Sequence, residues 1–216
     1  LQGSVRRHEG RLRINAQLVE GASATLVWAD RFEGAAADLF DLQDRLTEQI
    51  VGAFVRANLT RDYEAAVEVL DRALALNHNS AMAFGFSSLV GAHSEQHQRA
   101  VEHAHKALRL SPLDDPLNYH PYCALALTHL FTHAYGDAAR YSALAVRANL
   151  GFSIPYAYLA ASHVGSGNLE AARSASRRLL EVAPGFSVGN YLRTNLLRPH
   201  LMEELAVALR TAGIPE

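Results

Sequence analysis

The sequence predicts a mainly α-helical fold made of repeated helical hairpins, preceded by a short β segment. Two observations predict it. From residue 62 onward a pattern of small, aliphatic and turn residues returns about every 34 residues, and the first 33 residues instead alternate between polar and apolar. Hydrophobic residues make up 49% of the chain and charged residues 19%, which is enough to form a core. We expect strands plus a helix over 1–58, an array of about four repeats over 59–197, and a C-terminal capping helix over 198–216.

The N-terminal part follows the period of two that is typical of half-buried strands. Strands are expected over 4–7, 11–18 and 26–32, with a turn at 21–23. From Asp38 the apolar residues return at helical spacing instead.

Each repeat carries a small residue that lets its second helix lie close to its first. These residues are Ala66, Ala100, Ala138 and Ala172. Apolar residues about seven positions later fall on the same helical face. Proline at Pro112 and Pro184 stops the second helix, because it has no backbone N–H to continue the helical hydrogen bonds.

The first helix of each hairpin can then be placed. We expect these helices over 81–93, 118–133 and 153–166. A further helix is expected within 187–197, ended by Pro199, and a last amphipathic helix over 201–211 caps the stack.

The 34-residue pattern resembles the tetratricopeptide repeat (TPR) family. The N-terminal segment, which begins Gly3-Ser4-Val5-Arg6 and continues through Trp28-Ala29-Asp30-Arg31-Phe32, resembles the end of the TolB-like domain. That domain precedes TPRs in many bacterial class III adenylate/guanylate cyclases and follows winged-helix DNA-binding domains in some regulators. The resemblance implies a protein-binding regulatory tail of a longer signalling protein, whose catalytic domain, if any, lies upstream. The cyclase-like context also implies a cytoplasmic location, whereas a regulator with a membrane-spanning segment would place these modules outside the membrane.

Several functions are disfavoured by the residues themselves. The chain has no glycine-rich phosphate loop and no Gly-x-Ser-x-Gly motif, so we expect no enzyme activity within it and no cofactor. A formal charge of −2 gives no bulk attraction for nucleic acid or anionic lipid, and no run of about 18 apolar residues predicts a membrane span. Cys123 is the single cysteine, which excludes an internal disulfide. The expected partner is a protein or peptide: another domain of the same polypeptide, or a second copy.

In a TPR array the first helices line a concave surface that receives the partner. Ten residues map to this predicted groove: Met82, Leu89, His93, His120, Cys123, Leu127, Phe131, Ala157, Ala161 and Val164. The set is mostly apolar and poor in cations, so it predicts binding of an apolar segment rather than of a peptide's terminal carboxylate. The alternative, that these side chains only pack helix against helix, weighs at least equally for Leu127.

Eleven histidines give the rival hypothesis of a metal site. His93 and His97 are four residues apart, as are His129 and His133, and such pairs can share a helix face. No Cys, Asp or Glu is placed to complete either set, so solvated histidines at helix ends are the favoured interpretation. Three functional classes stay open: an interaction module of a cyclase-type protein, the sensing tail of a winged-helix transcription regulator, and a metal-responsive sensor.

Overall fold

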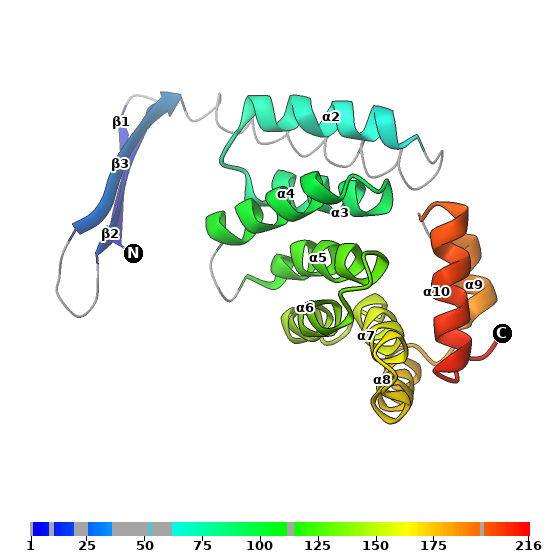
Figure 1. The fold of residues 1–216 in the computed structure, drawn as a ribbon. Coiled ribbons are helices and arrows are strands. Elements are labelled where there is room, and N and C mark those ends of the chain that lie inside the picture. The colour runs from blue at the N-terminus through cyan, green and yellow to red at the C-terminus, as the bar shows by residue number, and fades with distance from the viewer. Residues whose placement is uncertain are drawn as a thin grey trace. The chain divides into compact units, whose positions relative to one another are not determined.

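The computed structural model describes residues 2–8, 11–19, 26–35, 52, 62–111, 115–194 and 197–216 (Figure 1). The chain divides into two compact units, Leu1–Glu48 and Gln49–Glu216. Each unit is described separately below.

The first unit contains three strands: β1 (Gln2–His8), β2 (Arg11–Val19) and β3 (Leu26–Ala35). They form an antiparallel sheet in the order β1-β2-β3. Ile14 pairs with Val5 on one side and with Phe32 on the other, and the register shifts once, between Leu18 and Val19. Whether these strands belong to a TolB-like domain stays a prediction. The expected helical stretch that begins at Asp38 lies outside the described residues.

The described part of the second unit is helical. Its α-helices are α2 (Tyr63–Leu76), α3 (Ala81–His93), α4 (His97–Leu110), α5 (Tyr119–Phe131), α6 (Tyr135–Ala148), α7 (Ile154–Gly165), α8 (Leu169–Val182), α9 (Val188–Thr194) and α10 (Pro199–Thr211). A short 3₁₀ helix, η2 (Pro116–Asn118), precedes α5. Consecutive helices pair as α3–α4, α5–α6 and α7–α8, and each pair packs mainly on its sequence neighbours, as in a solenoid (Figure 1).

Close packing of the helices depends on the small residues that the sequence repeats. Ala66, Ala100, Ala138 and Ala172 are all fully buried. A Cβ atom on Gly91 of α3 would lie 3.2 Å from the backbone nitrogen of Ala100 in α4, so these two helices approach almost backbone to backbone. The predicted role is therefore confirmed for Ala100. Ala138 and Ala172 are buried in helices that pack on α5 and α7, and the first helix expected for the repeat of Ala66 lies outside the described residues.

Side-chain caps fix the beginnings of three helices. Asp62, Ser80 and Asn168 each accept a hydrogen bond from the backbone N–H three residues ahead, at 3.0–3.1 Å. These bonds satisfy N–H groups that the first turn of a helix leaves without partners. The helices α2, α3 and α8 therefore begin at or next to the residues that the repeat pattern predicts.

The turns inside the three hairpins share one backbone conformation. Glu95, His133 and Gly167 occupy the same place in their turns and have φ values of 64°, 58° and 77°. The next residue in each turn donates its N–H five residues back, to Gly91, His129 and His163, as in a Schellman motif. Glycine adopts this left-handed conformation readily, whereas the side chains of Glu95 and His133 make it less favourable.

The C-terminal helices differ in detail from the expectation. Pro199 does not end a helix; it is the first residue of α10, where its missing N–H costs nothing. The preceding helix, α9, is short and ends at Thr194. Helix α10 packs on α9 and on α7, the first helix of the last hairpin.

Candidate protein-interaction site

The ten residues of the predicted groove separate into two groups by burial. His93, Cys123, Leu127, Ala157 and Ala161 are buried, with exposed fractions between 0 and 8%. The other five, Met82, Leu89, His120, Phe131 and Val164, are half-buried. The buried five pack helix against helix, as the alternative interpretation expected for Leu127. A role in contacting a partner stays a prediction for the half-buried five.

The C-terminal segment, residues 188–194 and 197–214, accounts for part of this burial. One continuous apolar cluster contains Cys123 and Leu127 of α5, Ala157 and Ala161 of α7, and the following residues of the C-terminal segment: Val188, Tyr191, Leu197, Leu201, Leu205, Ala206, Leu209 and Ile214. The segment therefore packs into the same core as the residues predicted to line the groove. The spacing of Leu201, Leu205 and Leu209 predicted the buried face of α10 but not the surface that α10 covers.

Polar contacts at the start of α10 attach the C-terminal segment to the turn between α3 and α4. Arg198 Nε lies 3.3 Å from Glu95 Oε2, and His200 Nε2 lies 3.1 Å from Glu95 Oε1. The guanidinium of Arg198 also lies 5.5 Å from the ring centroid of Tyr63, within the range of a cation–π contact. Glu95 has an unfavourable left-handed backbone conformation. Its carboxylate contacts two basic side chains from the start of the C-terminal helix.

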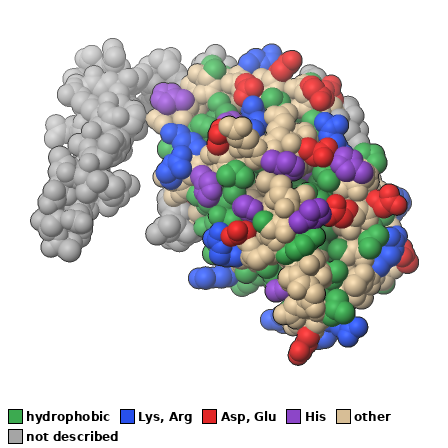
Figure 2. Space-filling model, viewed as in Figure 1, with side chains coloured by type: hydrophobic (Ala, Val, Ile, Leu, Met, Phe, Trp, Pro, Cys, Tyr) green, Lys and Arg blue, Asp and Glu red, His purple; other side chains and the backbone are tan. Residues whose placement is uncertain are grey.

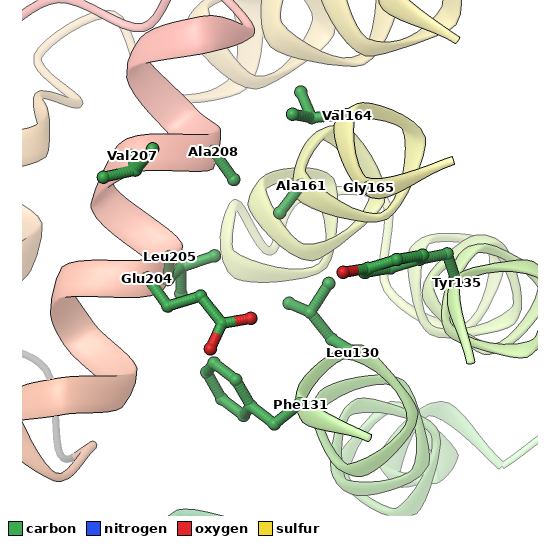
Figure 3. A pocket seen from close by; sticks show the side chains of 10 residues that line it. All are labelled: Leu130, Phe131, Tyr135, Ala161, Val164, Gly165, Glu204, Leu205, Val207 and Ala208. Atoms are coloured by element: carbon green, nitrogen blue, oxygen red, sulfur yellow. The ribbon is translucent and has the colours of Figure 1, made fainter. Parts of the chain in front are cut away.

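A pocket of about 150 Å³ lies between α5, α7 and α10 (Figure 3). The described residues that line it are Leu130, Phe131, Tyr135, Ala161, Val164, Gly165, Glu204, Leu205, Val207 and Ala208. In Figure 3 the side chains of Glu204 from α10 and Tyr135 from α6 point toward the space between them. Three predicted groove residues, Phe131, Ala161 and Val164, are therefore brought to one concave site.

The wall of the pocket on the α6 side depends on a glycine. The ring of Tyr135 lies directly against Gly165, and a Cβ atom at that position would overlap the ring. The Tyr135 hydroxyl is 2.8 Å from His133 Nδ1, and His133 Nδ1 is 3.7 Å from Glu204 Oε1. The latter distance is too long for a hydrogen bond. The Glu204 carboxylate therefore stands at the pocket without a strong partner among the described residues that line it.

Of the four histidines proposed as metal ligands, two contact tyrosine rings or hydroxyls and the other two are buried or half-buried. Burial lowers the pKa of His93 to about 4, because the charged imidazolium loses its hydration there. His129 stacks on the ring of Tyr141 with centroids 5.4 Å apart, and His133 contacts Tyr135. His97 is half-buried at the start of α4. In the part of the chain that the structure describes, no three His, Cys, Asp or Glu side chains lie close enough to hold a metal ion.

We expect calorimetric titration with Zn²⁺ to show no saturable uptake below millimolar concentration. Zinc in structural sites takes four protein ligands, and the histidine pairs supply at most two each. Uptake at micromolar zinc that disappears in a His129→Ala, His133→Ala double variant would contradict this expectation and restore the metal-sensor hypothesis.

A polar cluster around the buried Ser87 connects the hairpin of α3 and α4 to α2. The hydroxyl of Ser87 lies 2.8 Å from His103 Nδ1 and accepts hydrogen bonds from Arg99, whose guanidinium also donates to Asp71 at 2.7 Å. Ser87 is fully buried, so it offers no nucleophile to a substrate. Burial also raises the pKa of the Cys123 thiol, which keeps it protonated and unreactive. Neither group gives the chain a catalytic centre.

The described residues on the face shown in Figure 2 form no large patch of one charge sign. Lys/Arg and Asp/Glu side chains are interspersed over the face in Figure 2, with several histidines among them. No helix among the described residues is long and apolar enough to cross a membrane.

Comparison with solved structures relates this geometry to a known fold. A crystal structure of MamA protein superposes with a TM-score of 0.53 at 16% identity, covering 79% of this chain and 91% of MamA. Residues 41 to the end of MamA from Desulfovibrio magneticus RS-1 give a TM-score of 0.53 at 18% identity, covering 78% and 89%. Together with the repeats and hairpins described above, these two superpositions establish the fold. It is that of a tetratricopeptide-repeat protein.

The curated sequences add one partial relative. The chain is 44% identical over 64 residues to a protein named Putative adenylate cyclase 3 from Rhizobium meliloti (strain 1021). The match covers 30% of this chain and 11% of that protein. No protein-family model matches the sequence. The helical TPR fold is therefore established, and the domain context of the chain is a matter for proposal.

Proposed function

We propose that this chain is a protein-interaction module of the TPR type and the regulatory tail of a bacterial signalling protein resembling a class III adenylate/guanylate cyclase. The interaction role rests on the TPR array and on the pocket between α5, α7 and α10, where half-buried apolar side chains remain in reach of a partner. The cyclase context rests on the 64-residue match to a cyclase-named protein and on the TolB-like resemblance of the N-terminal residues. The partner is a polypeptide, and the site of action is the cytoplasm.

The deciding experiment is recovery of the native polypeptide with an antibody raised against this chain. Intact mass and N-terminal sequencing establish which domain precedes Leu1, and formation of cyclic nucleotide from ATP or GTP is assayed in the recovered material. We expect a longer species with cyclase activity. A winged-helix domain upstream would instead assign the chain to a transcription regulator, and a polypeptide of about the present length would make it a free-standing adaptor.

A further inference from the structure

The pocket between α5, α7 and α10 combines an apolar interior with a single carboxylate. Among the ten described residues that line it, Glu204 alone carries a charge, and the others are aliphatic, aromatic or glycine. Glu204 is 46% exposed, and among the described residues its ion-pair contact is to His133, at 3.7 Å. This separation is beyond hydrogen-bond distance, so the carboxylate oxygens of Glu204 keep their capacity to accept hydrogen bonds from a ligand.

The size of the pocket limits what can enter. A volume of about 150 Å³ is smaller than the roughly 300–1,000 Å³ of pockets that hold whole small-molecule ligands. It is suited to one side chain of a larger partner. This matches the proposed role as a protein-interaction module, on which the present inference rests.

The chemistry of the lining selects the kind of side chain. Leu130, Val164 and Leu205 offer apolar contacts to a chain of methylene groups, as the stem of a lysine or arginine needs. The rings of Phe131 and Tyr135 flank the same space, which Tyr135 approaches with its hydroxyl (Figure 3). Aromatic rings attract a cation that reaches their faces. The carboxylate of Glu204 supplies the opposite charge.

We propose that this pocket receives a basic side chain, Lys or Arg, from a partner polypeptide, with its aliphatic stem against the leucines and its charged head at Glu204. The site requires the C-terminal segment, because four of its lining residues belong to α10. Partner binding at this pocket therefore depends on α10 remaining docked on α7. This specificity differs from that of the predicted groove, which the sequence assigns to an apolar segment.

The proposal is tested by titrating the whole isotope-labelled chain with blocked single residues and following the backbone amide signals by NMR. The probes are the N-acetyl N-methylamides of lysine, arginine and norleucine; norleucine keeps a butyl side chain but lacks the charge. We expect a basic probe to shift the signals of Val164, Gly165 and Ala208. Glu204→Gln should weaken that binding about tenfold, the loss expected for one charge-assisted contact.

Glu203→Gln is the matched control, because Glu203 is an exposed acid on the same helix that does not line the pocket. Its dissociation constant for the basic probe should equal that of the unaltered chain. The proposal is overturned if norleucine binds as tightly as lysine and arginine, if neither basic probe shifts the pocket signals, or if Glu204→Gln binds like the unaltered chain. None of these results tests the proposed signalling role. That role is tested by the antibody experiment, whose outcome does not depend on this pocket.

Discussion

Replacing Leu127 by alanine is expected to lower the free energy of unfolding by about 2–5 kcal/mol. The side chain of Leu127 is fully buried in the apolar cluster that α5 and α7 share with the C-terminal segment. Truncation to alanine removes apolar contacts and leaves a cavity that the packed helices cannot fill completely. Urea unfolding followed by circular dichroism measures the change.

Leu150 supplies the matched control for this leucine-to-alanine change. It lies outside the helices and is 67% exposed, so Leu150→Ala should change the free energy of unfolding by no more than about 0.5 kcal/mol. Equal effects of the two substitutions would show that Leu127 is not part of the core.

A test of partner binding needs a different residue. A glutamate in place of the buried Leu127 would bury a charge and destabilise the fold, so its effect on binding could not be interpreted. Phe131 is half-buried, and a substitution there can report on partner binding.

Lowering the pH from 7 to 4 is expected to reduce the free energy of unfolding, with His93 as the largest identifiable contributor. The pKa of His93 is about 4 in the folded protein against 6.5 for an unperturbed imidazole. Between these values the unfolded chain binds a proton that the folded chain does not, so stability is fully present above pH 6.5 and is lost as the pH falls toward 4. The difference corresponds to about 3 kcal/mol.

The measurement is the urea midpoint as a function of pH for the unaltered chain and for His93→Gln, which cannot take up a proton in this range. Burial lowers the pKa of His103, His120, His129 and His163 as well, so some pH dependence should persist in the variant. The variant should nevertheless lose most of the His93 contribution. Identical pH profiles for the two proteins would mean that His93 is hydrated in the folded state.

The repeat pattern was sufficient to predict the hairpin helices because their determinants are local. Helix α3 begins and ends at the expected residues, since Ser80 caps its start and the turn around Glu95 ends it. Helices α5 and α7 are within one or two residues of expectation, and the small shifts come from the 3₁₀ turn before α5 and from capping residues. Small residues at repeated positions also predicted which helices lie close together.

The candidate site was predicted only in part, for a physical reason. Heptad-like spacing shows which side of a helix is apolar, but it does not distinguish a surface open to a partner from one covered by another part of the same chain. Cys123 and Leu127 lie on the predicted side of α5, and the C-terminal segment joins them in one core. Glu204 was missed entirely, because a glutamate on the last helix carries no sequence signal that relates it to Phe131 or Tyr135.

The sequence by itself determined the fold class, the hairpins and the apolar sides of the helices, because these follow from periodicity, caps and small residues close together along the chain. Only the tertiary structure decided what those sides contact. Docking of α10 on α7 joins residues far apart in sequence, and so does the contact of His200 with Glu95 in the turn after α3. That docking is what encloses the pocket and places one carboxylate beside apolar and aromatic side chains.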